Sequence, residues 1–328
     1  MKISVIIPSY KRPSDLERCL AAVSSQNRPA DELLVVAREG DEETLRIASA
    51  FRHRVDTLRT VRVAEPGVIA ALNCGLDNAT GDLLVFTDDD SEAQADWLER
   101  IHASFSSDSI GAVGGRDWLQ VPQEPAKFQP SEVGRVGVLS WYGKKYGNHH
   151  CPLRGHTKKV MFLKGVNMAF RRSALGSYRA DTRLHGSGAQ IGWEIDLCLQ
   201  IRESGFDVVF DDRILVKHFC GHRLPGDRRD DLTGPVFADL CFNNHYLFAK
   251  HLDMYWSAAH FCNGILLGSR RVPGLLASVK WTLKGDRHVF RRLWQMAVSA
   301  LTGFRAGRQA RTGGRQSGMD WQVTRGSA

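Results

Sequence analysis

The chain has 328 residues and a formal net charge of +8, with 43% hydrophobic and 24% charged residues. This is the composition of a folded globular protein, and it excludes a largely disordered chain. No run approaches the roughly eighteen apolar residues expected of a transmembrane helix. The seven cysteines include no Cys-x-x-Cys pair, which indicates reduced thiols in the cytosol rather than a disulfide framework.

Short apolar runs alternate with amphipathic helical patterns along the first half of the sequence. Strands are predicted at 3–7, 33–36, 60–63 and 83–87. Helices are predicted from a Ser14-x-x-Glu17 capping box and over 41–51, 68–78 and 96–105. The alternation favours an α/β fold with a mostly parallel sheet that is covered on both faces. The first apolar run is also too short for a secretory signal.

The second half is less regular. A long polar region over 116–158 is of the kind that forms a lid or an acceptor loop. A pair of strands within 160–170, a helix over 194–203 and short strands at 208–210 and 214–216 are predicted next. From Pro235 onward the pattern is helical and basic, with an apolar stripe at Phe290, Leu293, Trp294, Ala297 and Leu301.

These patterns predict three parts. A first domain covers 1–230 and divides into two halves, 1–115 and 116–230. A basic helical appendage follows at 231–306. The Gly- and Arg-rich tail at 307–328 is predicted to be disordered.

Three consecutive aspartates, Asp88, Asp89 and Asp90, follow the apolar run 83–86 directly. Carboxylates crowded at the end of a buried strand repel one another unless a cation lies between them, and a divalent ion with oxygen ligands is the usual solution. In a parallel sheet, ligands bind beyond the carboxyl ends of the strands. On the triplet alone, an exposed acidic turn or an Asp-rich helix cap stays open as the alternative.

Five segments together resemble the family 2 glycosyltransferases of GT-A fold, in order and spacing, across roughly residues 2–220. They are Val5-Ile6-Ile7-Pro8-Ser9-Tyr10, Asn73-Cys74-Gly75-Leu76, the stretch 81–90 that ends in the aspartates, Gly165-Val166-Asn167-Met168-Ala169-Phe170-Arg171-Arg172, and Gly192-Trp193-Glu194-Ile195-Asp196-Leu197. The resemblance implies a Rossmann-like sheet with helices on both faces, a nucleotide-sugar donor, inverting transfer and a Mg²⁺ or Mn²⁺ ion. It also implies that 1–230 is the catalytic domain, with 1–115 as its nucleotide-sugar-binding half and 116–230 as its acceptor half.

The resemblance also implies roles for the aspartates. Asp88 would contact the ribose or base side of the nucleotide, Asp90 would ligate the metal that bridges the two phosphates, and Asp89 would assist either. His218 follows a predicted strand at a place where such enzymes can supply a third metal ligand. A packing histidine is the alternative.

A second acidic site lies at Glu194 and Asp196. The family has Glu-Asp-x-Asp here, with the first Asp as the general base. In this chain the register places Trp193 at the usual Glu and Glu194 at the base position. Two residues apart on a helix, Glu194 and Asp196 point about 200° apart, so they cannot share a role. Glu194 is predicted as the base and Asp196 as a structural or acceptor-orienting acid. The alternative is that Glu194 only stabilises the helix dipole.

The donor side carries one departure from the family pattern. Arg38 stands where an acid that binds the base is common, so base recognition is in doubt, and a solvated loop cation is the alternative. Predicted donor contacts also include the following residues: Pro8, Ser9, Tyr10, Arg12, Asn73, Lys164 and Asn167. For Arg12, and for the pair Lys164 and Asn167, a structural role stays open.

Between Arg270 and Arg315 the sequence has eleven Lys or Arg residues and one acid, Asp286. Beside Trp281 and Trp294, such charge is consistent with a helix on anionic lipid, which suits a lipid-linked acceptor. A helical appendage packed on the catalytic domain with a solvated basic face is the alternative. Nucleic-acid binding is not predicted, because no recognised motif accompanies the charge.

The predicted function is a metal-dependent glycosyltransferase that builds a polysaccharide or glycolipid, in the cytoplasm or peripheral to the cytoplasmic face of the membrane. A nucleotidyltransferase on a similar sheet and a non-catalytic nucleotide-sugar-binding protein are the rivals. Histidines and cysteines at 149–156 and 218–222 lack a paired Cys-x-x-Cys, so structural zinc is not favoured.

Overall fold

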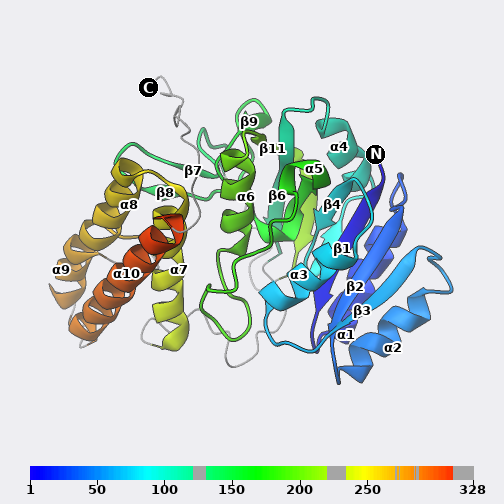
Figure 1. Cartoon of the computed structure of the whole chain (residues 1–328), viewed down its shortest axis with the longest axis horizontal. Helices are drawn as coiled ribbons and strands as arrows, with labels where there is room; N and C mark the ends of the chain where they lie inside the picture. The colour runs from blue at the N-terminus through cyan, green and yellow to red at the C-terminus, as the bar shows by residue number, and fades with distance from the viewer. Residues whose placement is uncertain are drawn as a thin grey trace.

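The computed structural model describes residues 1–120, 131–219, 234–269, 272, 274–283, 285 and 288–312. Among them, nine strands form one central sheet (Figure 1). In pairing order, eight of the strands are β3 (Leu58–Val63), β2 (Glu32–Arg38), β1 (Ile3–Ser9), β4 (Leu83–Phe86), β10 (Met168–Arg171), β6 (Ile110–Leu119), β11 (Asp207–His218) and β5 (Ser91–Ala93). The ninth strand, β9 (Thr157–Lys159), pairs with β11, and β7 (Val138–Leu139) pairs with β8 (Lys145–Tyr146) in a separate sheet.

Strand direction determines which side chains meet. The strands β3, β2, β1 and β4 are mutually parallel. β10 is antiparallel to both β4 and β6, and β11 is parallel to β6, so β6 and β11 run in the same direction as β4. The carboxyl ends of β1, β4, β6 and β11 therefore lie at one edge of the sheet, and the predicted mostly parallel sheet is confirmed.

Helices cover the sheet on both faces because the strand side chains alternate between two hydrophobic clusters. On one face, Val5 and Ile7 pack with α1 (Pro13–Ser24), α2 (Glu42–Phe51) and α4 (Trp97–Ser104). On the other face, Ile6 and Phe86 pack with α3 (Val68–Asn78), α5 (Arg172–Leu175), α6 (Trp193–Glu203) and α7 (Pro235–His251).

The remaining helices form a layer at one end of the molecule, far from β3 (Figure 1). They are α8 (Met254–Leu266), α9 (Leu275–Leu283) and α10 (Val289–Thr312). α10 continues through Thr312, so the predicted disorder is wrong for residues 307–312; residues 313–328 lie outside the described residues. The predicted appendage boundary at 231 also lies outside them.

Three local predictions differ from the structure. α1 begins at Pro13 and its cap residue Arg12 makes no side-chain cap hydrogen bond, so the predicted Ser14 capping box is wrong; proline is pre-organised for the first helical position. Residues 165–167 form a 3₁₀ turn before β10 instead of lying within a pair of strands. The two short strands at 208–216 are one strand, β11, with a register shift between Asp211 and Leu215.

Candidate active site at the carboxyl edge of the sheet

The aspartate triplet lies at the carboxyl end of β4, as predicted, and the parallel neighbours bring further polar groups to it. Asp117 stands near the end of β6 and His218 is the last residue of β11. One ligand atom each from Asp88, Asp90 and His218 lies within 4.8 Å of the others. This is the group among the described residues whose geometry could hold a metal ion.

Burial makes the charged form of these crowded carboxylates costly. It raises the pKa of Asp88 to about 6, and the charge of Asp90 adds to the effect. It raises the pKa of Asp89 to about 7, although the Arg12 guanidinium opposes the shift. The triplet is therefore a largely buried cluster whose ionised form a nearby cation would stabilise. The alternative of an exposed acidic turn is wrong.

Arg12 supplies part of that charge. Its Nη1 donates to Asp89 Oδ1 at 3.1 Å and to Asp90 Oδ2 at 3.3 Å. The hydroxyl of Ser9, at the end of β1, donates to Asp89 Oδ2 at 2.8 Å. Ser9 and Arg12 thus position Asp89, whereas direct contact of either with a nucleotide stays a prediction.

Asp117 is a site residue that the sequence analysis did not identify. Its side chain is fully buried and accepts hydrogen bonds from Lys164 Nζ and, at 2.9 Å, from His218 Nδ1. Burial would raise the pKa of Asp117, but His218 and Lys164 outweigh this and hold it below its usual range. Asp117 is therefore a stable anion that holds a lysine and a histidine in place.

The Asp117 contact orients His218 toward the triplet. Because Nδ1 faces Asp117, Nε2 faces Asp90 Oδ1, at 3.3 Å. Burial would lower the pKa of His218, but the hydrogen bonds with Asp117 and Asp90 raise it to about 10. To ligate a metal, Nε2 must give up its proton to solvent as the ion binds. A neutral ring whose Nδ1–H donates to a carboxylate is the usual arrangement of a metal-ligating imidazole. Two carboxylates and this imidazole fit Mg²⁺ or Mn²⁺.

Glu194, the predicted base, lies in the first turn of α6 and is half-buried. The preceding Trp193 fixes that turn against the sheet: its ring packs edge-on against Phe86, with centroids 6.0 Å apart, at the end of β4. A Cβ on Gly165 would collide with the same ring. Trp193 thus has a packing function where the family has an acid, and Glu194 is the half-buried carboxylate beside it.

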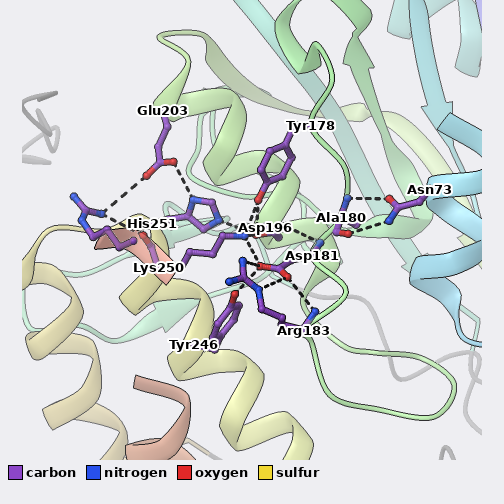
Figure 2. A network of polar contacts seen from close by, with 11 residues as sticks. Asn73, Tyr178, Ala180, Asp181, Arg183, Asp196, Glu203, Tyr246, Lys250 and His251 are labelled. Carbon is purple, nitrogen blue, oxygen red and sulfur yellow. Dashed lines mark hydrogen bonds and ion pairs between the residues drawn. The ribbon is translucent and has the colours of Figure 1, made fainter. Parts of the chain in front are cut away.

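Asp196 is fully buried and points into a polar network that includes Lys250 and His251 (Figure 2). Lys250 Nζ donates to its Oδ1 at 2.7 Å, and His251 Nε2 lies 2.8 Å from the same oxygen. The Tyr178 hydroxyl also donates to Oδ1, and the Asp181 amide donates to Oδ2, each at 3.0 Å. Because these groups surround its carboxylate, the contacts favour the structural role predicted for Asp196 over the acceptor-orienting one.

Two predicted donor ligands have other partners. Asn73 exchanges hydrogen bonds with the backbone of Ala180, at 2.9 and 3.0 Å, and ties α3 to the loop before α6 (Figure 2). Asn167 is fully buried: its amide oxygen accepts from the Trp97 indole and its nitrogen donates to two carbonyl groups. Both side chains stabilise the fold, so we do not include them among the donor contacts.

The other predicted donor residues stay at the edge. Tyr10 is 36% exposed, and the Arg38 guanidinium lies 5.9 Å from the centre of its ring. Pro8 is half-buried in β1. Lys164 keeps 39% of its side chain exposed although its amine contacts Asp117. All four remain accessible to a ligand at this edge.

The predicted absence of a zinc cluster concerns two histidine groups. His149 Nε2 lies 3.0 Å from the Phe162 carbonyl, and His156 bonds to Asp212. These contacts direct the two rings to different partners. The second group extends to Cys220 and His222, which lie outside the described residues.

Comparison with known proteins agrees with this geometry. A family model described as Glycosyltransferase like family 2 matches residues 1–228. Glucosyl-dolichyl phosphate glucuronosyltransferase of Haloferax volcanii is 26% identical over 232 residues, which cover 66% of this chain and 69% of that protein. Glycosyltransferase AglE of the same organism is 35% identical over 116 residues, covering 34% of this chain and only 38% of its own length.

Solved structures show the same fold at low identity. Mannosyltransferase PcManGT from Pyrobaculum calidifontis, in complex with GDP-Man and Mn²⁺, has a TM-score of 0.52 and 15% identity, covering 92% of this chain and 85% of that one. Residues 1–349 of TarS from S. aureus, in complex with UDP, give 0.54 and 13%, covering 98% and 94%. The predicted GT-A fold is confirmed. Given the sheet, the acidic site at its edge and a family match over most of its length, the chain belongs to glycosyltransferase family 2.

Proposed function

We propose that the protein is an inverting glycosyltransferase that moves a sugar from a nucleotide-sugar to a hydroxyl of a glycan or lipid-linked acceptor. The observation that carries the proposal is the cluster of Asp88, Asp90 and His218 at the carboxyl edge of the sheet. The helix turn that carries Glu194 packs against the end of β4, the strand that leads into the cluster, through the contact of Trp193 with Phe86. The named relatives that act on sugars, and the fold shared with structures holding GDP-Man or UDP, support it.

Asp88, Asp90 and His218 would hold Mg²⁺ or Mn²⁺. Such an ion, when bound, neutralises negative charge on the departing nucleoside diphosphate. The resemblance implied that Asp88 contacts the ribose or base. Because its carboxylate lies with the other two ligand atoms, we propose Asp88 as a further metal ligand. Asp117 fixes the tautomer and orientation of His218, and Arg12 holds Asp89 and Asp90 in position.

Glu194 is the proposed general base. Its carboxylate would take the proton of the acceptor hydroxyl as that oxygen attacks the anomeric carbon from the face opposite the leaving group, which inverts the configuration. Burial lowers the pKa of Lys145 and the charge of Glu194 opposes that shift, so the Lys145 ammonium interacts electrostatically with the proposed base. Asp196 cannot share the role because its oxygens are buried and bonded.

Tyr10, Arg12, Arg38 and Lys164 are the proposed donor contacts. The cation–π pair of Arg38 and Tyr10 could place a planar surface beside a nucleotide base. The exposed part of Lys164 could reach the diphosphate.

Transfer assays with two variants test the mechanism. With Mn²⁺ and a panel of UDP-, GDP- and dTDP-sugars, Asp90→Ala should lose both transfer and metal-dependent donor binding. Glu194→Gln should lose transfer by roughly a hundredfold or more while it keeps donor binding. Glu99→Gln, an exposed change on α4, is the matched control. Full transfer by Glu194→Gln would disprove the base assignment, and donor binding without transfer in the unmodified protein would favour a non-catalytic binding protein.

A further inference from the structure

Large apolar side chains are exposed mainly on the C-terminal helices. Among the described residues, twelve exposed large hydrophobic side chains lie between residues 254 and 301: Met254, Tyr255, Leu266, Leu267, Leu275, Leu276, Val279, Leu283, Phe290, Trp294, Val298 and Leu301. The remainder of the described chain exposes Met1, Tyr10, Trp118 and Trp141. Isolated exposed hydrophobics are ordinary, but such a concentration marks an interaction surface.

The exposed side chains follow helical spacing on two helices that contact each other. On α9 they include Leu275, Val279 and Leu283, and on α10 they are Phe290, Trp294, Val298 and Leu301. We call these seven residues with Leu276 the outer apolar face. Leu283, Phe290 and Trp294 are 84%, 76% and 75% exposed, which is far more than packing on the protein would leave.

α10 packs on the protein through Val289 and Met296 in its first half and through small residues further along. Gly303 and Gly307 face α7 so closely that a Cβ on either would collide with the carbonyl oxygen of Phe242 or Tyr246. Ala300 is fully buried on the same side. The predicted apolar stripe therefore turns its largest residues outward. Large apolar residues on the face of a helix that points away from the protein are typical of helices that lie on a membrane surface.

The charged residues beside the outer apolar face indicate which kind of partner binds there. From Met254 to Thr312 the sequence has a single acid, Asp286, and Arg291 and Arg305 are exposed on α10 within one helical turn of the apolar stripe. A second copy of the chain on the same face would bring arginines against arginines. Anionic lipid headgroups complement these arginines, while the acyl region receives the apolar side chains.

We propose that the outer apolar face lies on the surface of an anionic membrane. No helix within the described ranges is long and apolar enough to cross a membrane, so the helices would lie in the interface. Figure 1 places α9 and α10 together at one end of the molecule, with α7 between them and the sheet. That the contact brings a lipid-linked acceptor to Glu194 rests on the proposed function; the membrane contact itself does not.

Vesicle sedimentation of the full chain tests the proposal. The unmodified protein should sediment with vesicles of phosphatidylcholine and phosphatidylglycerol, and much less with phosphatidylcholine alone. The double variant Phe290→Ser/Trp294→Ser should bind at least about tenfold more weakly, because it removes two large apolar side chains from the interface. Trp141→Ser removes an equally exposed tryptophan outside α8–α10 and should bind like the unmodified protein.

A charge variant, Arg291→Glu/Arg305→Glu, keeps the test valid if the apolar variant folds poorly. It should bind the anionic vesicles several-fold more weakly, and added salt should weaken the unmodified protein in the same direction. Binding that is absent in the unmodified protein, or equal in all variants, would overturn the proposal. So would a dimer in light scattering that Trp294→Ser dissociates while vesicle binding is absent. Sedimentation needs no activity, so an inactive protein that binds vesicles would refute only the proposed function.

Discussion

Two clusters of buried carboxylates differ in how far the protein satisfies them. At the sheet edge, four carboxylates face three cations among the described residues: Asp88, Asp89, Asp90 and Asp117 against Arg12, Lys164 and His218. In the network around Asp196, three carboxylates face four cations: Asp181, Asp196 and Glu203 against Arg183, Lys250, His251 and Arg311.

The pKa values follow this difference. Burial acts in both clusters. At the sheet edge it raises the pKa of Asp88 and Asp89, although Lys164 and His218 lower that of Asp117. In the second cluster cationic partners outweigh burial and lower the pKa of Asp181 and Asp196. Carboxylates that the fold leaves crowded are suited to binding an external cation, and carboxylates that it saturates are suited to holding helices together. Burial alone therefore does not separate a functional acid from a structural one, because the cationic partners decide the direction of the pKa shift.

The sharpest test removes one acid from the crowded cluster. Asp90→Asn should reduce transfer by about a thousandfold or more, because the stabilisation that a bound ion supplies is worth several kcal/mol. In the presence of a chelator, its free energy of unfolding should be unchanged or higher, because one of several repelling charges is gone. Steady-state kinetics with Mn²⁺ and urea unfolding measure the two quantities. A strongly destabilised Asp90→Asn would show that this cluster is structural after all.

The same change in the saturated cluster should act on stability. Asp196→Asn leaves the Lys250 and His251 charges without their main partner in the interior, which should cost about 3–5 kcal/mol in urea unfolding. Asp77→Asn is the matched control, because Asp77 pairs with Arg179 at the surface, where such pairs contribute about 0–1 kcal/mol. Equal effects of the two substitutions would remove the distinction between the clusters.

The sequence predicted the parts of the fold and site that depend on local pattern. The helix at Val68–Asn78 and the strand before the aspartates follow from hydrophobic periodicity and flanking turn residues. The rule that parallel strands present their carboxyl ends at one edge placed the aspartates at a ligand-binding edge. The proximity of His218 to them was predicted from its place after a strand together with the resemblance to family 2 glycosyltransferases.

Features that depend on tertiary contacts could not be predicted. β6, and with it Asp117, was missed because Gly114 and Gly115 weaken the strand pattern; both are needed because a Cβ there would collide with Leu163 or Ile214. The cationic partners of Asp196, Lys250 and His251, lie more than fifty residues away, on a helix whose pattern gave no sign of them. The direction of the apolar stripe on α10 depended on which face α7 accepts.

A double-mutant cycle should show how tightly the saturated cluster is coupled. Lys250 Nζ donates to Tyr178, Asp181 and Asp196, each at 2.7 Å. Lys250→Met combined with Asp196→Asn removes opposite charges together, so the double variant should lose less stability than the two single variants added, by about 1–3 kcal/mol. Urea unfolding of the four proteins gives the coupling free energy. Additive losses would mean that Asp181 and His251 already compensate each partner.

The smallest expected effect is a pH dependence that belongs to the saturated cluster. Burial would raise the pKa of Asp181 and Asp196, but Arg183 lowers the first, His251 lowers the second and Lys250 lowers both. The two acids therefore add to the free energy of unfolding above their unfolded pKa, near 4, and this contribution is lost as pH falls through their folded pKa values. Burial would lower the pKa of His251, but Asp196 and Glu203 raise it. Its contribution is complete below about 6.5 and is lost as pH rises through the folded value.

The cluster should therefore stabilise the protein most between about pH 4 and 6.5. His251→Asn should abolish the loss of stability that accompanies rising pH. It should leave the loss that accompanies falling pH, because Lys250 and Arg183 still face the two acids. Urea midpoints of the unmodified protein and His251→Asn should thus differ most in that interval and converge at alkaline pH. A difference that grows as pH rises would mean that His251 acts in its neutral form, so that its contact with Asp196 is an ordinary hydrogen bond rather than an ion pair.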